Sequence, residues 1–303
     1  MSLEIDNVEN TLIEGGFTVS ERCLKDKICF NLAARKGLQL LLVKCVENLL
    51  AIRKHAVSEL KLISHHLIAS PIIIAMNNSG GRMGDDAIYT RHGVSAITNK
   101  TLFDAITNNR FPIVEAKPGG FYVQLDGKSI RTNRRMLNLS MGDLAKLVGV
   151  SRGTIYGYEK GLIKASVEIA LKLEATLGIP LVQPIEVFKN LQLDDKFHKT
   201  SFNSKNDVVK KVASKLHSFG FTTNVTPHAP FDFIASSSEN NRIIGTIDAI
   251  RCPNPKILFS IAEISDSKYL NISENDGSED STVSYAVFLK LRKKQELIAL
   301  INY

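Results

Sequence analysis

The sequence predicts a multidomain chain in which two α/β domains flank a compact all-α module. At 303 residues the chain is long enough for two or three cores of ordinary size. Residues 1–117 and 189–303 mix short apolar runs with helical periodicity, whereas residues 118–188 are helical over most of their length. The composition, 44% apolar and 23% charged, is typical of a folded protein and excludes a disordered one.

The first domain is predicted as one sheet flanked by helices. Apolar residues recur at helical spacing before Gly15-Gly16 and again between Val46 and Leu67. The stretch FNLAARKGLQLLLVKC consists of two apolar runs on either side of a turn at Lys36-Gly37. The predicted elements, in order, are a helix over 6–16, three strands between 17 and 45, a helix over 46–67, strands within 71–76 and 87–97, and a helix over 99–107.

The middle module begins at the boundary signal Pro118-Gly119-Gly120. A brief strand and a turn at Asp126-Gly127 follow, and from Ser129 to Leu177 the pattern is helical with short interruptions. Pro180 and Pro184 close the module, because proline does not continue a helix.

The third domain contains a second copy of the opening pattern. VVKKVASKLHSFGFTTNV repeats the order of NVENTLIEGGFTVSERC, a helix followed by Gly-Phe and a strand of alternating polarity. APFDFIASSSENNRIIGTIDAI then corresponds to KICFNLAARKGLQLLLVKCVENL, with Phe231-Asp232 at the positions of Phe30-Asn31. An internal duplication of the first domain explains this order. The alternative is that any helix–strand–strand unit gives a similar pattern.

The positive charge of the chain is concentrated in the middle module. The net charge is +7, and residues 128–178 hold nine Lys and Arg against four Asp and Glu, while the segments on either side are nearly neutral. A compact basic module between neutral domains indicates that the middle of the chain meets a polyanion such as nucleic acid. The alternative is a basic helix surface that is only solvated.

The stretch RRMLNLSMGDLAKLVGVSRGTIYGYEKG has the signals of two short helices that cross at a tight turn. Gly149 can adopt the positive φ that ends the first helix, and Ser151 is a good N-cap for the second. Ile155 and Tyr158, three residues apart, anchor the second helix from its inner side. Its outer side and its N-terminal end are then free to enter a major groove.

This stretch resembles the helix-turn-helix of the lambda Cro/repressor class, and the resemblance covers a five-helix pattern from Ser129 to Pro184. It implies that double-stranded DNA is the partner, that the helix over about 151–159 lies in the major groove, and that the protein binds as a homodimer. Arg134 and Glu159 match the positions of a buried structural ion pair. The matching base-reading positions are Arg152, Thr154 and Tyr156. The matching phosphate-contacting positions are Ser151, Lys160, Lys164, Arg131 and Arg135.

Three positions depart from the class. Gly153 and Gly157 fall where base-reading side chains are often found, and Met141 stands where a phosphate-binding Gln is common. Direct readout is therefore expected to depend mainly on Arg152, with DNA shape or dimeric spacing adding specificity.

The stretch FNLAARKGLQLLLVKC (residues 30–45) also has the outline of a metal-dependent nuclease core of the restriction-endonuclease type. In such a core, one strand supplies an Asp and the next strand supplies a Glu-x-Lys. Such a core needs hard oxygen ligands on one face of the sheet. Here the matching positions hold Asn31, Leu42 and Lys44, and in the second copy Asp232 is not followed by a Glu-x-Lys. The sequence therefore predicts a degenerate domain without a metal site and a protein that is not an enzyme. The open alternative is a helix-turn-helix-targeted nuclease in which Glu47 or Asp232 holds magnesium.

The chain as a whole resembles archaeal transcriptional regulators that combine a restriction-endonuclease-like N-terminal domain with a Cro/repressor-type helix-turn-helix. The stretches that carry this resemblance are LLLVKC, LKLISHHLIASPIII, YTRHG, APFDFIA and AKPGGFYVQLDGKSIR. The resemblance implies a DNA-binding transcriptional regulator whose flanking α/β domains supply dimerisation or sense a partner. It names neither an operator nor an effector ligand.

The sequence shows none of the features typical of membrane or secreted proteins. No apolar stretch reaches the roughly 18 residues of a membrane span, and the acidic N-terminus lacks the basic-then-apolar order of a signal peptide. Cys23, Cys29, Cys45 and Cys252 form no C-x-x-C pair, which favours reduced thiols and argues against a zinc site. We therefore expect a cytoplasmic protein without metal, cofactor or membrane contact.

Overall fold

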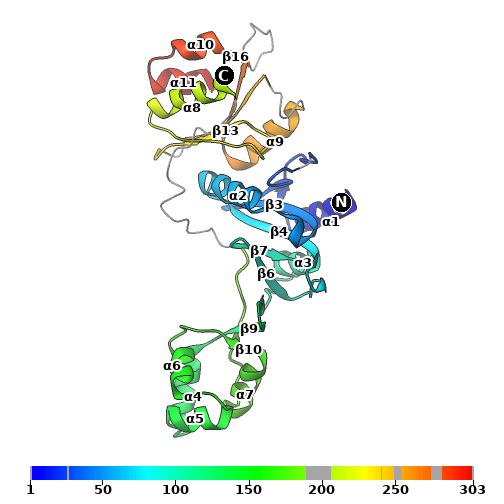
Figure 1. The fold of residues 1–303 in the computed structure, drawn as a ribbon, viewed down its shortest axis with the longest axis vertical. Coiled ribbons are helices and arrows are strands. Elements are labelled where there is room, and N and C mark those ends of the chain that lie inside the picture. Colours follow the sequence, from blue (N-terminus) through cyan, green and yellow to red (C-terminus); the bar gives the residue numbers. More distant parts are fainter. Residues whose placement is uncertain are drawn as a thin grey trace. The chain divides into compact units, whose positions relative to one another are not determined.

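The computed structural model describes residues 2–25, 27–188, 206–239, 241–248, 254–273 and 282–301. The chain folds into two compact units, unit 1 made of residues 1–74 and 188–303 and unit 2 made of residues 75–187 (Figure 1). Residues 75–117, which the sequence analysis groups with the first domain, belong to unit 2. The predicted start of the third domain at residue 189, and Cys252, lie outside the described residues. None of the described helices combines the length and apolar character that a membrane crossing requires.

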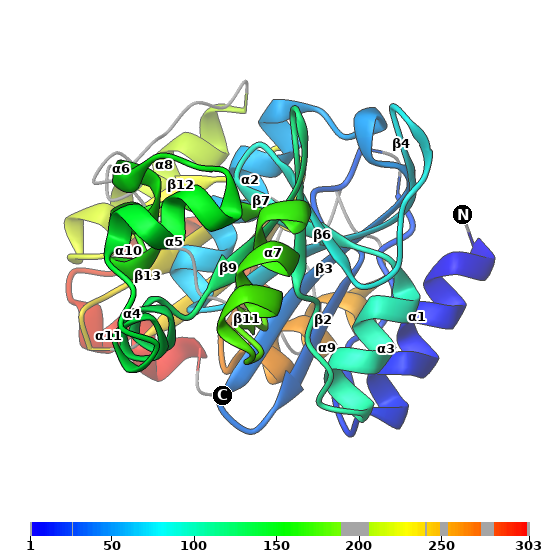
Figure 2. The same ribbon diagram turned by 90° about the horizontal axis from the view of Figure 1, so that it is seen from below.

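The first half of unit 1 is a helix, a set of strands and a second helix. The elements are α1 (Ser2–Glu14), β1 (Thr18–Val19), β2 (Leu32–Lys36), β3 (Gln39–Asn48), a 3-10 turn (Leu49–Ala51), α2 (Lys54–Leu67) and β4 (Ser70–Asn78). The strands lie in the order β1-β2-β3-β4, and β2 and β3 are seen side by side as blue arrows in Figure 2. The predicted helix over 46–67 begins later, because β3 continues to Asn48, whose side chain caps the 3-10 turn by accepting from Leu50 N at 2.9 Å.

The second half of unit 1 repeats the order helix, three strands, helix, strand. Its elements are α8 (Asp207–Ser218), β12 (Thr222–Val225), β13 (Phe233–Ser236), β14 (Arg242–Ile247), α9 (Pro255–Ser265), β15 (Lys268–Ser273), β16 (Thr282–Ser284), α10 (Tyr285–Lys290) and α11 (Lys294–Ile301). The sheet order is β12-β13-β14-β15-β16. β12, β13 and β14 pair antiparallel, and β14, β15 and β16 pair parallel.

The two halves of unit 1 use the same side-chain hydrogen bond at one corner of their sheets. Asn31 precedes β2, and its Oδ1 accepts from the N–H of Cys45 on β3 at 3.0 Å. Asp232 precedes β13, and its Oδ2 accepts from the N–H of Ile247 on β14 at 2.9 Å. Both side chains are buried. Asn31 and Asp232 thus have equivalent structural roles, each joining the start of one strand to its neighbour.

The two halves also pack on each other reciprocally. Helix α2 of the first half packs against β13 of the second, and α9 of the second half packs against β2 of the first. The rings of Phe30 and Phe231 lie 6.4 Å apart, inside one apolar core that also includes Leu42, Leu60 and Leu258. Because each half covers the sheet of the other, removing either half would expose apolar surface on the one that remains.

Unit 2 begins with a small set of strands and one helix. The elements are β5 (Gly81–Arg82), β6 (Ala87–Arg91), β7 (Val94–Ile97), α3 (Asn99–Thr107), β8 (Val114–Lys117) and β9 (Gly120–Leu125). β6 and β7 form an antiparallel hairpin where the sequence predicts one strand over 87–97, because the positive φ of His92 and Gly93 turns the chain between them. β6 also pairs parallel with β8, which pairs antiparallel with β9.

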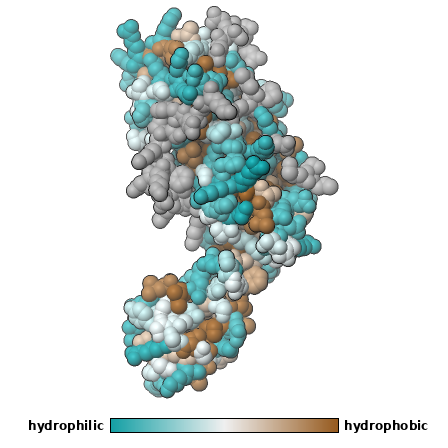
Figure 3. Space-filling view, in the orientation of Figure 1, coloured by the Kyte–Doolittle hydropathy of each residue, from teal (hydrophilic) through white to brown (hydrophobic). Residues whose placement is uncertain are grey.

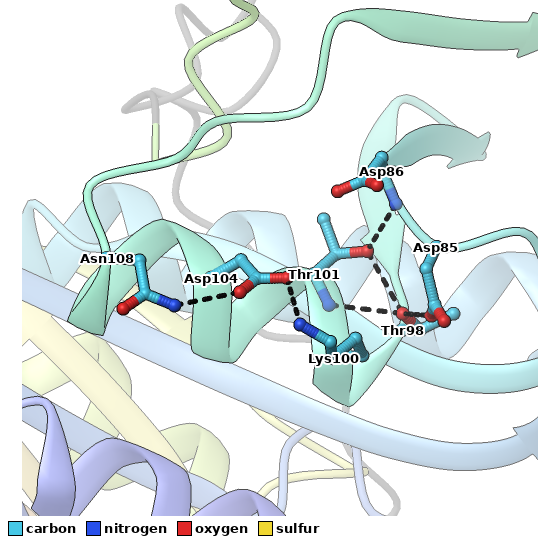
Figure 4. A network of polar contacts seen from close by, with 7 residues as sticks. All are labelled: Asp85, Asp86, Thr98, Lys100, Thr101, Asp104 and Asn108. Carbon is cyan, nitrogen blue, oxygen red and sulfur yellow. Dashed lines mark hydrogen bonds and ion pairs between the residues drawn. The ribbon is translucent and has the colours of Figure 1, made fainter.

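A polar network ties the N-terminus of α3 to the segment before β6 (Figure 4). Thr98 is the N-cap of α3: its Oγ1 accepts from Thr101 N at 3.2 Å and donates to Asp85 Oδ1 at 2.5 Å. Within the helix, the hydrogen bond from the Lys100 ammonium lowers the pKa of Asp104. The residues directly before β6 are therefore fixed to the helix cap through Asp85.

Candidate nucleic-acid interface

Residues 127–183 form four helices and two short strands around one apolar core. The elements are α4 (Gly127–Met136), α5 (Met141–Val148), α6 (Arg152–Glu159), β10 (Ala165–Ser166), α7 (Val167–Leu177) and β11 (Val182–Gln183). The prediction of an all-α, five-helix module is corrected in two respects. Both β10 and β11 pair antiparallel with β9, and no fifth helix is found among the described residues up to 188. Gly178 ends α7 in the left-handed conformation, and the following prolines keep the chain extended.

Side-chain caps fix where the first two of these helices begin. Asp126 caps α4, with its Oδ1 accepting from Lys128 N at 3.0 Å and Ser129 N at 3.1 Å. The hydroxyl of Ser129 donates to the other carboxylate oxygen at 2.8 Å, and these hydrogen bonds hold the pKa of Asp126 below its ordinary value. At the start of α5, Ser140 and Asp143 form a reciprocal capping box.

The turn between α5 and α6 has the geometry that the sequence predicts. Gly149 ends α5 with φ +80°, a conformation that costs a residue with a side chain about 1 kcal/mol or more. Ser151 caps α6, accepting from Thr154 N at 3.0 Å. Ile155 is fully buried and Tyr158 is 5% exposed, so these two side chains anchor the inner side of α6.

The outer face of α6 consists of polar, basic and aromatic side chains. Arg152, Gly153, Tyr156 and Lys160 are exposed, and their spacing of one, three and four residues places them on one side of the helix. Tyr156 is 49% exposed, and the Lys160 ammonium lies 5.9 Å from its ring centroid. No carboxylate pairs with Arg152 or Lys160 among the described residues. This face is therefore positively charged and open.

Two glycines of the module are required by packing. A Cβ on Gly157 would lie 2.8 Å from Ile163 Cδ1, so this position faces the inside of the module. Gly157 falls where base-reading side chains are often found in the class, but in this chain the residue is buried. A Cβ on Gly127 would lie 2.5 Å from the backbone oxygen of Tyr158, which shows how closely α4 approaches the end of α6. Nothing in the local sequence reveals this second contact.

Arg134 and Glu159 form a buried ion pair between α4 and α6. Arg134 Nε donates to Glu159 Oε1 at 2.6 Å and Nη2 donates to Oε2 at 3.3 Å. A third bond runs from Nη1 to the backbone oxygen of Leu139 at 2.8 Å. The two side chains are 9% and 6% exposed. The pair holds the C-terminal end of α6 against α4. This is the structural role that the resemblance to the Cro/repressor class implies for these two residues.

The remaining predicted DNA-contacting residues have different surroundings. Arg131 and Arg135 are exposed on α4. Ser151 and Thr154 lie at the start of α6 with their hydroxyl oxygens 2.9 Å apart. Lys164 is only partly exposed and forms an ion pair with Glu115 of β8, a contact that sequence reasoning missed because the partner is far away in the chain.

The nuclease positions of unit 1 do not fit the divalent cation that a restriction-endonuclease-like domain uses. Asn31 is fully engaged, since its Nδ2 donates to Cys23 O at 2.8 Å and its Oδ1 accepts from Cys45 N. Leu42 is fully buried in the core and offers no oxygen ligand, while Lys44 stands at the lysine position of the nuclease pattern. Within the described ranges no group of three or more His, Cys, Asp or Glu could hold a metal ion. The donor chemistry at these positions thus opposes magnesium binding.

Two family profiles match the chain. One is described as a PD-(D/E)XK superfamily domain and matches residues 2–112, and the other is described as a helix-turn-helix and matches residues 130–183. The first covers the segment with the nuclease outline, and the second covers most of α4 and all of α5 to β11.

Related proteins from archaea align with most of the chain. One from Methanothermobacter thermautotrophicus is 33% identical over 245 residues, covering 80% of this chain and 74% of the relative. Another from Methanococcus maripaludis is 32% identical over 310 residues, covering 96% of this chain and 94% of the relative. Both carry the provisional name HTH-type transcriptional regulatory protein.

Among solved structures, the restriction-modification controller protein C.AhdI from Aeromonas hydrophila is 36% identical. The match covers 18% of this chain and 80% of that chain, with a TM-score of 0.17. A TM-score this low supports no statement about the fold of the whole chain.

Proposed function

The chain belongs to the family of archaeal HTH-type transcriptional regulatory proteins, and on this premise we propose that it binds double-stranded DNA and regulates transcription. The observation that carries the proposal is the outer face of α6, which presents Arg152, Tyr156 and Lys160 to solvent while Ile155 and Tyr158 anchor the helix from inside. A helix held in this way can enter a major groove with its N-terminal end leading. The cytoplasm is the compartment in which such a protein meets DNA.

The proposed contacts divide into base reading and phosphate binding. Arg152 leads the base-reading set, because a guanidinium can donate two hydrogen bonds to guanine O6 and N7. Thr154 and Tyr156 complete that set. The phosphate-binding set is Ser151, Lys160, Lys164, Arg131 and Arg135. Within it, Lys164 would exchange its ion pair with Glu115 for a phosphate.

The salt dependence of binding tests the phosphate contacts. Lys160→Ala is expected to weaken binding to every duplex alike and to lower the slope of log K against log salt by about 1, because one fewer counterion is released. Fluorescence anisotropy with labelled duplexes at several salt concentrations measures both effects. Lys172→Ala on α7 removes the same charge from a side chain outside the proposed interface and should change neither the affinity nor the slope. Equal slopes for all three proteins would refute the contact.

We also propose that the protein binds DNA as a homodimer that reads two half-sites about 34–36 Å apart. Brown, apolar side chains are exposed on the face of the helix-turn-helix module in Figure 3. Six large apolar residues of this module are at least 44% exposed: Met136, Leu137, Leu147, Leu162, Ile163 and Leu171. Exposed apolar surface of this kind supports an interface with a second copy.

The PD-(D/E)XK-type domain serves, in this proposal, as a scaffold and not as an enzyme. The alternative is a nuclease targeted by the helix-turn-helix, and the neutral Asn31 and aliphatic Leu42 disfavour it. Of the acids that might replace them, Asp232 is buried and bonded to Ile247 N, and Glu47 is exposed on β3. Burial raises the pKa of Glu4, and the nearby charge of Glu47 adds to that rise, so Glu47 has one carboxylate neighbour. Among the described residues, however, no group of three or more His, Cys, Asp or Glu is arranged to hold a cation.

A plasmid-cleavage assay separates the two functions. Supercoiled plasmid incubated with the full chain and magnesium or manganese is expected to remain supercoiled. Cleavage that disappears in Glu47→Gln or Asp232→Asn would establish the nuclease function instead. Because Glu47 is exposed, the first of these variants should keep its fold.

We further propose that the chain has three segments, residues 1–117, 118–188 and 189–303, and that the third duplicates the first. The shared element order, the equivalent bonds of Asn31 and Asp232, and the reciprocal packing of α2 and α9 support the duplication. Reciprocal contacts are the pattern of a symmetric homodimer, here between two halves of one chain.

A further inference from the structure

A basic cavity lies beside the end of β3 in unit 1. Its volume is about 280 Å³, and its lining includes the cationic residues Lys27, Lys44 and Arg53 together with His55. The other described lining residues are aliphatic, and none of them is an Asp or Glu. As far as the described residues show, the cavity therefore combines positive charge with apolar walls and no acid that could neutralise that charge.

Lys44 is the deepest charge in this cavity. It lies on the same face of β3 as Leu42, which is fully buried, and Val46, which also lines the cavity. No hydrogen bond or ion pair of Lys44 is found among the described residues. Burial lowers its pKa, and the smaller effects of the nearby Cys29, Cys45 and Cys23 act in the opposite direction. Lys44 is partly buried, and an ammonium that is partly withdrawn from water without a counter-charge costs free energy, so an anion from outside the chain would stabilise it.

The carboxylate of Glu59, on α2, already has hydrogen-bond partners. Glu59 accepts from the backbone N–H of His228 at 2.7 Å through Oε1 and lies 2.8 Å from His228 Nδ1 through Oε2. The His228 ring in turn stacks on His55, with centroids 4.5 Å apart. Glu59 thus fixes the wall of the cavity through His228 and does not pair with Lys44.

Two backbone features favour an anion in the same place. The first turn of α2 borders the cavity through His55 and Ala56, and the N-cap residue Arg53 provides no side-chain hydrogen bond to that turn. The N-terminal end of a helix carries partial positive charge and attracts phosphate groups. Lys27 adopts φ +63°, a strained conformation for a residue other than glycine, and strain of this kind often marks a binding site.

We propose that this cavity binds a small phosphorylated anion, with Lys44 as its deep ligand and Lys27, Arg53 and His55 at its rim. The cavity is large enough for a phosphate or diphosphate group and lies at the lower end of the size of small-molecule sites. His55 of the first half stacks on His228 of the second half. An anion bound beside His55 would therefore lie where the two halves of unit 1 meet. The site does not depend on the DNA-binding proposal, because all its residues belong to unit 1.

Calorimetric titration of the full chain with pyrophosphate, at submillimolar concentration and constant ionic strength, tests the site. The wild-type protein is expected to bind at one saturable site. Lys44→Met should raise Kd at least about ten-fold, because it removes the charge and keeps the shape of the side chain. The matched control Lys54→Met removes an exposed lysine next to the cavity and should leave Kd within about two-fold.

The thermal stability of the free proteins distinguishes a binding lysine from a structural one. Without ligand, Lys44→Met should melt at the same temperature as wild type or higher, because it removes a partly buried charge that has no ion pair among the described residues. A lower melting temperature would mean that Lys44 supports the fold, and the proposal would fail. Arg53→Gln changes an exposed side chain and should still raise Kd several-fold.

Two further outcomes would overturn the proposal. One is a Kd for pyrophosphate that is the same in wild type, Lys44→Met and Arg53→Gln, or the absence of saturable binding. The other is a Lys44→Met protein that binds duplex DNA more weakly and pyrophosphate normally, because the cavity would then contact the nucleic acid backbone.

Discussion

Glu159→Gln is expected to destabilise unit 2 by about 3–5 kcal/mol, because it leaves the Arg134 guanidinium buried without a counter-charge. The two side chains are 9% and 6% exposed, so solvent cannot replace the lost carboxylate. The backbone bond from Arg134 to Leu139 O satisfies only one edge of the guanidinium. Urea unfolding followed by circular dichroism measures the loss as a shift of the midpoint.

The matched control for this variant is Glu168→Gln on α7. Glu168 pairs with Lys172 on an exposed surface, where the carboxylate side chain is 75% exposed, and its loss should cost less than about 1 kcal/mol. The double variant Arg134→Met, Glu159→Leu should recover much of the stability, since an apolar pair can replace a buried ion pair. Equal effects of the two Glu→Gln changes would show that the buried pair does not hold α6 in place.

Arg152→Ala is expected to remove the preference for one base pair in each bound half-site, at a cost of about 1–3 kcal/mol on the best sequence. Arg152 is exposed at the first position of α6 and has no ion pair to lose among the described residues, so the fold should not change. Because Gly153 adds no side chain and Gly157 is buried, few other groups on this helix can compensate.

Selection of bound sequences from a random duplex library, followed by competition binding, measures this preference. Wild type should enrich one motif, and Arg152→Ala should enrich the same motif with one position relaxed. The Lys160→Ala protein serves as the control, since a phosphate contact should weaken binding without changing the motif. An unchanged motif in the Arg152→Ala protein would exclude the proposed reading role.

The parts of the structure that sequence predicts well are set by local signals. The turn between α5 and α6 follows from Gly149, which takes positive φ, and from Ser151, which caps the next helix. Both signals act within a few residues. The equivalence of Asn31 and Asp232 was also visible in the sequence order, and their matching hydrogen bonds are its structural counterpart.

The parts that sequence did not predict depend on contacts between distant residues. Gly157 is needed because Ile163 packs on it, and Lys164 meets Glu115 across 49 positions of the chain. The strands β10 and β11 have two residues each, too few for an alternating pattern to be seen. The cavity around Lys44 arises where residues 27, 44 and 53 meet, and each alone looks like an ordinary surface charge.

The central claim is that the outer face of α6 contacts DNA, and hydroxyl-radical labelling of Tyr156 tests it most directly. Tyr156 is 49% exposed on that face, while Phe259 on α9 is 45% exposed in unit 1 and provides an internal reference. We expect saturating duplex DNA to reduce the oxidation of Tyr156 several-fold and to leave that of Phe259 unchanged. Undiminished oxidation of Tyr156 in the protein–DNA complex would contradict the claim.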